Sequence, residues 1–372
     1  MEKRWILQFC HCHYGPFLDV ARQYAALFKD RPYKVLTVYL TGEDTPEARA
    51  GSASDDVIFL GFKSRQVSGL KWQAIQALRK ILQSRDFSLI IAHRFKPIYI
   101  ACLAGKLPVI GVHHAFGDYD RAPRRWFAHA FRQRLMLLGV SDAVRDDLRR
   151  CLPNWPAERI ATLYNRIDIA AVQGEQISRE AARATLGLAL DAFVVGNVGR
   201  LHPDKDQATL IRGFAQALPR LPANARLVIV GEGELESELK ALAHQLGITE
   251  HVDFLGQVAH ARRYFRAFDI FALSSDHEPF GMVLLEAMAA NVPLVSTNCG
   301  GAREIVEGLG QLFTLGNAEQ LAEALTTTAN TRQTKLHDAG ERLQTLFSDQ
   351  AAASSFWLRL AAARLPNLAQ AV

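Results

Sequence analysis

Residues 270–287, IFALSSDHEPFGMVLLEA, combine a short apolar run, a polar loop and a second, longer apolar run. The first run, Ile270 to Leu273, has the length and flanking turn residues of a buried strand. Pro279 and Gly281 mark the loop, and a helix is expected to start near Gly281. The stretch therefore predicts a strand followed by a helix, which is the repeating unit of a parallel α/β sheet.

The same alternation of short apolar runs and longer amphipathic segments extends outward in both directions. In the N-terminal half the expected strands are Trp5–Phe9, Val35–Tyr39, Leu89–Ala92, Val109–His113 and Leu137–Val140. In the C-terminal half they are Phe193–Val198, Arg226–Val230, Val252–Leu255, Ile270–Leu273 and Leu294–Ser296. Each half is thus expected to form a doubly wound parallel sheet, with a polar, alanine-rich connection from Ala170 to about Leu190.

The chain has 372 residues, which exceeds the usual size of one domain. We expect a Rossmann-like domain over residues 1–172, a second over residues 173–347, and a cleft between them. The composition of Gln350 to Leu365 predicts a helix. In two-domain enzymes of this kind the last helix can cross back to the first domain, so residues 348–372 are expected to form a return segment.

The composition is that of an ordinary globular protein, with 49% hydrophobic and 22% charged residues. No apolar run approaches the ~20 residues needed to span a bilayer, and the N-terminus lacks a signal-peptide core, so a cytoplasmic protein is expected. The five cysteines are scattered and odd in number, which favours reduced thiols. A net charge of +5 suggests attraction to polyanions such as nucleic acid, anionic lipid or phosphorylated glycans.

Candidate binding residues follow the strands of the C-terminal half, because ligands of open α/β sheets bind at the carboxyl ends of strands. Arg200 and Lys205 flank the turn after the strand Phe193–Val198. Fixed cations there would stabilise the charge that grows on a leaving diphosphate. The glycines after the next two strands, Gly231, Gly233 and Gly256, would let backbone come close to a ligand.

The helix expected near Gly281 supplies further candidate groups. Backbone amides of Gly281, Met282 and Val283 would point at an anion, as helix N-termini do for phosphate. Glu278 precedes this helix, and Glu286 lies about one and a half turns inside it, roughly 7 to 8 Å along the axis. One carboxylate can then bind sugar hydroxyls and the other ribose hydroxyls, with a diphosphate between them.

On these residues the sequence resembles the retaining glycosyltransferases of family 4, which have the GT-B fold of two Rossmann-like domains facing a cleft. The matching motifs of the C-terminal half are the Arg200 and Lys205 pair, Gly231-Glu232-Gly233, Phe254-Leu255-Gly256 and the two glutamates. Those of the N-terminal half are Pro108 to His114, Val140-Ser141-Asp142 and Asn165-Arg166-Ile167-Asp168. The resemblance covers nearly the whole chain.

The resemblance implies a role for each matching residue. Arg200 and Lys205 would contact the donor diphosphate, Glu286 the ribose and Glu278 the donor sugar. His114 would contact the donor sugar or the incoming acceptor.

Two departures from the family pattern fall in the N-terminal half. Gly15 stands where the family has a glycine-rich loop close to the donor phosphate, but the usual paired glycines are reduced to one. Arg166 replaces the common glycine before Ile167-Asp168. The resemblance also implies retention of the anomeric configuration, and no carboxylate of this half is placed by motif as a nucleophile. Front-face displacement assisted by the departing phosphate is therefore the expected route.

Two patterns suggest a metal, and neither predicts one. Cys10-His11-Cys12-His13 lacks a second ligand pair at zinc-site spacing, so it is interpreted as a strand end. Asp118-Tyr119-Asp120 matches the Asp-x-Asp signature of metal-dependent glycosyltransferases of another fold, but it is far in sequence from the diphosphate residues. No obligatory metal and no cofactor is expected. His93, which follows a strand, is interpreted as structural or peripheral.

Arg121 to Arg134 carries five arginines interleaved with Trp126, Phe127 and Phe131. Such a stretch suits an anionic membrane surface, and a lipid-linked acceptor would then follow. A solvated helix whose aromatic side chains face the core would give the same pattern, and the sequence leaves both interpretations open.

The expected function is glycosyl transfer from a nucleotide-diphosphate sugar to a cell-envelope glycan, such as a lipopolysaccharide core, with possible peripheral contact at the inner membrane. One alternative is a nucleotide-sugar epimerase of the same fold. Another is a nucleic-acid-binding protein, but the chain contains no recognisable nucleic-acid module, so no nucleic-acid partner is expected.

Overall fold

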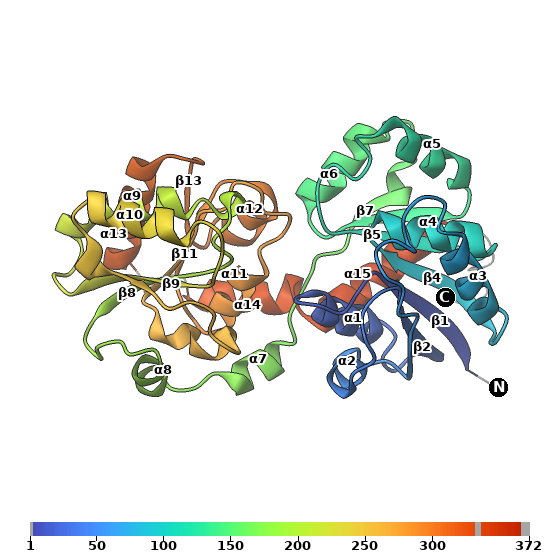
Figure 1. The fold of residues 1–372 in the computed structure, drawn as a ribbon, viewed down its shortest axis with the longest axis horizontal. Coiled ribbons are helices and arrows are strands. Elements are labelled where there is room, and N and C mark those ends of the chain that lie inside the picture. The colour runs from blue at the N-terminus through green and yellow to red at the C-terminus, as the bar shows by residue number, and fades with distance from the viewer. Residues whose placement is uncertain (1–2, 332–335, 366–372) are drawn as a thin grey trace. The chain divides into compact units, whose positions relative to one another are not determined.

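The computed structural model describes residues 3–331 and 336–365 and contains two parallel sheets, each in its own compact unit (Figure 1). The N-terminal unit consists of Met1–Arg166 together with Asp349–Val372, and the C-terminal unit of Ile167–Ser348. Two doubly wound parallel sheets, as expected from the sequence, are thus confirmed. The end of the expected return segment, residues 366–372, lies outside the described residues.

The sheet of the N-terminal unit has the strand order β3-β2-β1-β4-β5-β6-β7, and every pairing is parallel. Its strands are β1 (Arg4–Cys10), β2 (Tyr33–Tyr39), β3 (Asp56–Phe59), β4 (Phe87–His93), β5 (Val109–His113), β6 (Leu135–Gly139) and β7 (Ile160–Thr162). Each strand expected in this half is present. The two unexpected strands, β3 and β7, have only four and three residues and form the two edges, so their hydrophobic signal is weak.

The helices of the N-terminal unit are α1 (Phe17–Ala26), α2 (Pro46–Gly51), α3 (Trp72–Leu82), α4 (Phe95–Ala104), α5 (Ala122–Phe131), α6 (Asp142–Cys151) and α15 (Asp349–Ala362), with a short 3₁₀ turn, η1 (Ala157–Arg159). The motif Val140-Ser141-Asp142, noted above for its resemblance to the family, leads into α6, which begins at Asp142. The Ser141 hydroxyl caps α6 by accepting a hydrogen bond from the Val144 amide.

The sheet of the C-terminal unit has the order β10-β9-β8-β11-β12-β13, again all parallel. Its strands are β8 (Phe193–Val198), β9 (Ala225–Val230), β10 (Val252–Phe254), β11 (Ile270–Leu273), β12 (Leu294–Thr297) and β13 (Gln311–Phe313). The edge strand β13, of three residues, was not expected from the sequence. Because parallel strands end on the same side, the loops after β8, β9, β10 and β11 lie along one edge of this sheet.

The helices of the C-terminal unit are α7 (Ile169–Glu175), α8 (Arg179–Thr185), α9 (Gln207–Ala217), α10 (Glu236–Gln245), α11 (Met282–Ala289), α12 (Gly300–Val306), α13 (Ala318–Thr331) and α14 (Leu336–Leu346). Its 3₁₀ turns are η2 (Pro203–Lys205), η3 (Leu218–Arg220), η4 (Thr249–His251) and η5 (Ala261–Ala267). No described helix combines the length and the apolar character that crossing a bilayer requires.

The expected connection from Ala170 to about Leu190 is wrong. This stretch forms α7 and α8, which belong to the C-terminal unit. Arg183 of α8 is buried and donates to the buried Asp269 carboxylate at 2.9 Å, which fastens the stretch to the start of β11. The sequence pattern could not show this, because a single buried ion pair leaves no hydrophobic period.

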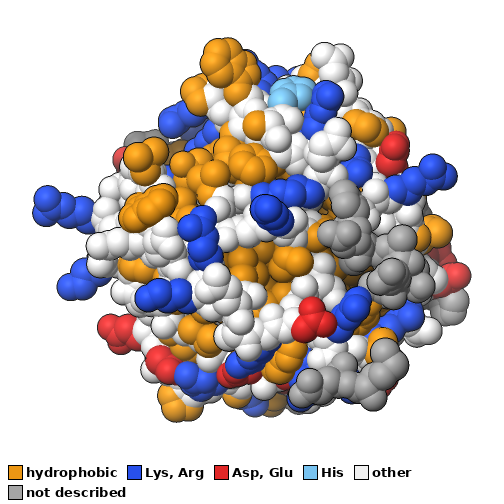
Figure 2. Space-filling model, turned by 90° about the vertical axis from the view of Figure 1, so that its right-hand side faces the viewer, with side chains coloured by type: hydrophobic (Ala, Val, Ile, Leu, Met, Phe, Trp, Pro, Cys, Tyr) orange, Lys and Arg blue, Asp and Glu red, His pale blue; other side chains and the backbone are white. Residues whose placement is uncertain are grey.

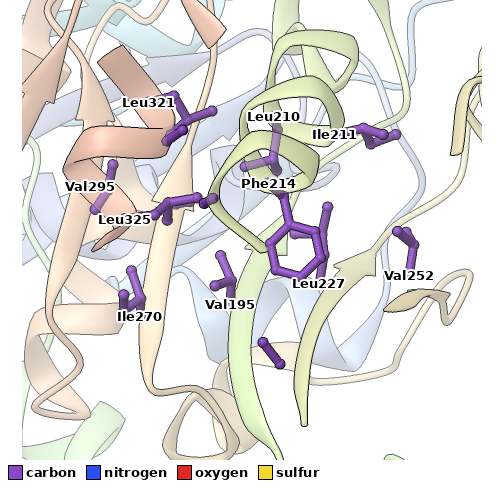
Figure 3. Packing of buried hydrophobic residues seen from close by; sticks show 14 of the residues in the cluster. Val195, Leu210, Ile211, Phe214, Leu227, Val252, Ile270, Val295, Leu321 and Leu325 are labelled. Carbon is purple, nitrogen blue, oxygen red and sulfur yellow. The ribbon is translucent and has the colours of Figure 1, made fainter. Parts of the chain in front are cut away.

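The core of the C-terminal unit lies between its sheet and the helices α9 and α13. Figure 3 shows Leu210 and Phe214 of α9 and Leu321 and Leu325 of α13 beside apolar side chains of the strands, among them Val195 of β8 and Leu227 of β9. Gly213 of α9 permits the close approach of the two helices, because a Cβ there would lie 2.6 Å from Leu321 Cδ2. This packing gives the loops at the sheet edge a rigid base.

Candidate functional site

Lys205 and Glu278 meet at the carboxyl edge of the C-terminal sheet. Lys205 ends the η2 turn after β8, and Glu278 lies in the loop between β11 and α11. The Lys205 ammonium donates to the Glu278 carboxylate at 2.9 Å. Their side chains are only 20% and 12% exposed, so this charge pair is largely shielded from water. The structure thus brings together two residues that the sequence placed in one binding site.

The loop after β11 holds Lys205 in place. The Ser274 hydroxyl donates to the Lys205 carbonyl at 2.8 Å, and the Asp276 amide donates to the Asp204 carbonyl at 3.1 Å. Sequence reasoning did not single out Ser274. Its position in the sequence could have marked it as a candidate, because Ser274 is the first polar residue after a buried strand that ends at the binding edge.

Arg200, the other expected cation, is more open to solvent. Its side chain is 70% exposed, and its guanidinium lies 3.5 Å from the Asp204 carboxylate. The same carboxylate lies 2.5 Å from His202 Nδ1 and 3.9 Å from Lys205 Nζ. Asp204 is therefore a further acidic group of this turn, which the sequence analysis passed over as part of the loop.

The two glycines after β9 have a packing requirement of their own. A Cβ on Gly231 would lie 1.9 Å from the Gly199 carbonyl oxygen, and one on Gly233 would lie 2.1 Å from the Leu201 carbonyl oxygen. Gly231 also has φ +139°, a conformation that side chains disfavour. These glycines let the loops after β8 and β9 touch, which explains them without a ligand and leaves their ligand contact a prediction.

Gly256 lies beside that turn. Its carbonyl accepts a hydrogen bond from the Gly231 amide at 2.8 Å, and its φ is +65°. The loops after β9 and β10 are therefore joined by a backbone hydrogen bond, and the loop after β8 packs against the loop after β9.

The helix α11 begins at Met282, as expected, with Gly281 as its N-cap residue. Gly281 has φ +103°, and no side chain among the described residues caps this helix. The first amides of the helix, including those of Met282 and Val283, can therefore receive an acceptor from outside the chain. Glu286 lies half-buried in the second turn of α11.

The loop that carries Glu278 is held from the side of β12. The Ser275 carbonyl accepts from the Thr297 hydroxyl at 2.7 Å and from the Cys299 thiol at 3.1 Å. The Gly301 amide donates to the Glu278 carbonyl at 2.9 Å. Burial raises the pKa of Cys299, which favours the neutral thiol. Sequence reasoning missed Thr297 and Cys299 as supports. Thr297 is the last residue of β12 and Cys299 lies two residues beyond it, so both stand at the binding edge.

The two candidates of the N-terminal unit lie after strands of their own sheet. His114 follows β5, and its Nε2 lies 3.2 Å from Nδ1 of His93. Burial, with the nearby His113 and Arg94, lowers the pKa of His114 to about 3, so the ring is neutral near pH 7. Gly15 lies between β1 and α1 with φ +56°, and a Cβ there would meet nothing within 4 Å.

The two patterns that suggested a metal make other contacts. The Asp118 carboxylate lies 2.6 Å from His113 Nδ1 and accepts from Arg124, whereas Asp120 pairs with Arg150 at 3.1 Å. The two carboxylates thus have different partners. In Cys10-His11-Cys12-His13, burial of Cys10 raises the thiol pKa, and burial lowers the pKa of His11 to about 4. Both features fit a packed strand end.

The arginine-rich stretch combines the two interpretations that the sequence left open. Three of its arginines bind backbone carbonyls of the protein: Arg124 that of Asp118, Arg125 those of Tyr119 and Asp120, and Arg134 that of Leu107. Phe127 also faces the protein, 5.0 Å from the Tyr99 ring. Trp126, by contrast, is 76% exposed. On the face shown in Figure 2, lysine and arginine side chains stand among exposed hydrophobic ones, and acidic side chains are fewer.

Two family models match the chain, one in each unit. The model described as Glycosyltransferase Family 4 matches residues 19–171, and the model described as Glycosyl transferases group 1 matches residues 178–343. The second match contains every candidate residue of the C-terminal unit. The first contains His114, and Gly15 lies just before it.

Among curated proteins, the lipopolysaccharide core biosynthesis glycosyltransferase LpsE of Rhizobium meliloti is 35% identical over 184 residues, which are 48% of this chain and 53% of LpsE. The chain spans about half the length of the curated relatives it matches. Among solved structures, a glycosyltransferase from Rickettsia africae has a TM-score of 0.83 at 14% identity and covers 98% of this chain and 99% of its own. HepE of Anabaena in complex with UDP-glucose has a TM-score of 0.76 at 23% identity, covering 96% and 99%. These similarities support the GT-B fold.

Proposed function

This chain belongs to the family 4, group 1 glycosyltransferases, and we propose that it transfers a sugar from a nucleotide-diphosphate sugar to a glycan acceptor. The observation that carries the proposal is the shielded Lys205–Glu278 pair beside the uncapped start of α11. A cation, a carboxylate and free backbone amides at one sheet edge suit a ligand that has both phosphate and hydroxyl groups.

In the proposed complex the diphosphate lies on the amides of Gly281, Met282 and Val283, with Arg200 and Lys205 as counter-charges. Glu278 accepts from sugar hydroxyls, and Glu286 accepts from ribose hydroxyls. The turns at Gly231, Gly233 and Gly256 line the space for the nucleobase. When the glycosidic bond breaks, charge grows on the diphosphate, and groups already fixed in place stabilise it at little reorganisation cost.

We propose that the reaction retains the anomeric configuration and needs no obligatory metal. The two cations and the positive end of α11 supply the charge that a metal supplies in other glycosyltransferases. In the N-terminal unit Asp118 is engaged by His113 and Arg124, which argues against its use as a nucleophile. Front-face displacement assisted by the departing phosphate fits these residues.

The acceptor is proposed to be a cell-envelope glycan on a lipid carrier, such as a lipopolysaccharide core. LpsE, a relative of this chain, is named for lipopolysaccharide core biosynthesis. The N-terminal unit also exposes Leu70, Trp72 and Trp126, which are 78%, 65% and 76% exposed. Such side chains beside arginines suit contact with an anionic membrane, which we propose takes place at the cytoplasmic face of the inner membrane.

The test is transfer activity in two variants, Glu286→Ala and Arg200→Ala. Each should lose roughly 10²-fold or more in kcat/KM, as loss of one fixed polar group at a reaction centre does. Glu250→Ala and Arg220→Ala are matched controls, because both residues are exposed and lie in the turns η4 and η3, which precede β10 and β9 at the opposite end of the sheet from the binding edge. Both should keep wild-type activity. Full activity of both site variants would reject the proposal.

Two further measurements separate this function from its alternatives. Incubation with donor alone should leave the sugar unchanged, whereas an epimerised sugar would identify an epimerase. Salt-sensitive binding to DNA without saturable binding of any nucleotide sugar would instead indicate a nucleic-acid-binding protein.

A further inference from the structure

A buried chain of hydrogen bonds lies behind His114 in the N-terminal unit. It starts at Gln8 of β1, passes through His93 at the end of β4, and ends at His114 after β5. Gln8 Nε2 lies 3.3 Å from His93 Nε2, and His93 Nδ1 lies 3.2 Å from His114 Nε2. Gln8 and His93 are only 1% and 2% exposed. The strands β1, β4 and β5 are neighbours in one sheet, so the chain has a rigid frame.

The donor and acceptor in each of these hydrogen bonds follow from Gln8. Gln8 Nε2 also donates to the Ala21 carbonyl at 3.2 Å, and a carbonyl can only accept. The amide nitrogen must therefore face both Ala21 and His93, since the reverse orientation would place two oxygens together. An amide nitrogen only donates, so His93 Nε2 accepts.

The proton positions of both histidines then follow. Burial and the neighbouring His114 lower the pKa of His93, and burial lowers that of His114, so both rings are neutral near pH 7. A neutral imidazole has one N–H, and since His93 Nε2 accepts, its proton is on Nδ1. That N–H donates to His114 Nε2, which leaves the proton of His114 on Nδ1. Among the described residues, nothing is hydrogen-bonded to His114 Nδ1.

We propose that Gln8 and His93 are positioning residues that hold His114 in the Nδ1-protonated tautomer, so that it offers a hydrogen-bond donor to its substrate. The inference rests on the proposed function, with His114 contacting the donor sugar or the incoming acceptor as the family resemblance implies, and it makes that contact more specific. His114 Nδ1–H then binds a sugar hydroxyl oxygen or another acceptor oxygen. In this state His114 is not a general base, because its single basic nitrogen is occupied by His93.

The opposite direction is excluded by the same count of donors. If His114 donated from Nε2, then His93 Nδ1 would accept and His93 Nε2 would carry a proton. That proton would face the amide nitrogen of Gln8, which is itself a donor, at 3.3 Å. Two donors facing each other inside a sheet would leave both without an acceptor, and buried polar groups are rarely left unpaired.

The test is the tautomer of His114, observed by long-range ¹H–¹⁵N NMR of histidine-labelled full-length protein. His114→Gln assigns the signals by their disappearance. The wild type should show His114 with a protonated Nδ1 and an unprotonated Nε2. An unprotonated Nδ1 would overturn the inference whatever the transfer activity is.

Two variants of His93 extend the test to function. His93→Leu removes the donor and should mix the two tautomers of His114 and lower kcat roughly tenfold or more, since a wrong tautomer costs triad enzymes about 10⁴ in kcat. His93→Gln keeps an N–H donor. It should therefore restore part of the tautomer preference of His114 and part of kcat. Unchanged spectra and rates in His93→Leu would contradict the positioning role. Full activity of His114→Ala would instead contradict the substrate contact of His114, whereas the proposed function itself fails only if Glu286→Ala and Arg200→Ala stay fully active.

Discussion

At the scale of single residues, the candidate donor site depends on close contacts that few residue types allow. Lys205 and Glu278 can approach because η2 and the loop after β11 are joined by one backbone hydrogen bond and by a hydrogen bond from the Ser274 hydroxyl. Gly231 allows the neighbouring loop to approach in turn. The order of these motifs was predictable from the sequence, because each follows an apolar strand. The particular hydrogen bonds that Ser274, Thr297 and His93 make were not, because a hydrogen bond between distant strands leaves no trace in sequence spacing.

The packing requirement of Gly231 predicts the effect of adding one methyl group. Gly231→Ala places a Cβ 1.9 Å from the Gly199 carbonyl oxygen, so the loops after β8 and β9 must separate. We expect a loss of roughly 1–3 kcal/mol in unfolding free energy, the usual cost of overpacking. Gly174→Ala is the control, because a Cβ there meets nothing within 4 Å. Equal stability of the two variants in urea unfolding would contradict this reason for Gly231.

Two partly buried histidines, His11 and His114, predict how stability depends on pH. The pKa of His11 is lowered to about 4 and that of His114 to about 3, whereas in the unfolded chain both lie near 6.5. Below about pH 6.5 the unfolded chain therefore binds more protons than the folded one, and stability falls as the pH is lowered toward 4. His11→Asn should show a smaller drop in Tm between pH 7 and pH 5 than the wild type. An equal drop would show that His11 does not hold its depressed pKa.

At the scale of elements, the return helix α15 shows what the sequence could and could not predict. Its helical composition was evident, and the structure packs it against the N-terminal unit. Trp357 donates to the Leu27 carbonyl at 3.1 Å and stacks on Tyr33 with ring centroids 5.9 Å apart. The ion pairs at its start were not evident. Arg166, which departs from the family pattern, is fully buried and donates to Asp349 at 2.7 Å, where Arg22 also binds at 2.8 Å.

The Arg166–Asp349 pair joins the two points at which the chain passes between the units, and this predicts a cost of breaking it. Arg166→Ala should lower the unfolding free energy of the N-terminal unit by roughly 2–4 kcal/mol. Breaking a buried pair costs ~3–5 kcal/mol, but Asp349 is one-third exposed. Arg4→Ala, which breaks an exposed pair with Asp86, should cost under about 1 kcal/mol. Urea unfolding followed by tryptophan fluorescence measures both, and equal costs would contradict the structural role of Arg166.

At the scale of the whole molecule, each of the two units is built on a parallel sheet. The alternation of strands and helices was predictable from the sequence along most of the chain. Each expected strand is present, because a central parallel strand is a continuous apolar run. The strands that escaped prediction, β3, β7 and β13, are short edge strands. The helices α7 and α8 escaped because their polar, alanine-rich sequence resembles a connection.

The surface of the N-terminal unit predicts binding to anionic membranes. A variant with Trp72→Ala and Trp126→Ala should bind vesicles of 30% anionic lipid several-fold more weakly than the wild type, and binding of the wild type should weaken in salt. Leu190→Ala, at a residue 62% exposed in the C-terminal unit, is the matched control. Co-sedimentation measures all three proteins. Equal binding of wild type and double variant, or equal binding to neutral vesicles, would contradict the membrane proposal.

The central claim is that the C-terminal unit binds a nucleotide-diphosphate sugar through Glu286 and its neighbours, and a thermal-shift panel tests it most directly. UDP-, GDP-, ADP- and CMP-sugars are compared on the wild type, on Glu286→Ala and on the control Glu250→Ala, which lies before β10 at the opposite end of the sheet. A ligand at 100 times its Kd stabilises the native state by about 2.7 kcal/mol, which raises Tm by roughly 5–10 °C for units of this size. One class of donor should raise Tm in the wild type and the control but not in Glu286→Ala. If no nucleotide sugar raises the Tm of the wild type, or if Glu286→Ala responds as fully as the wild type, the claim is wrong.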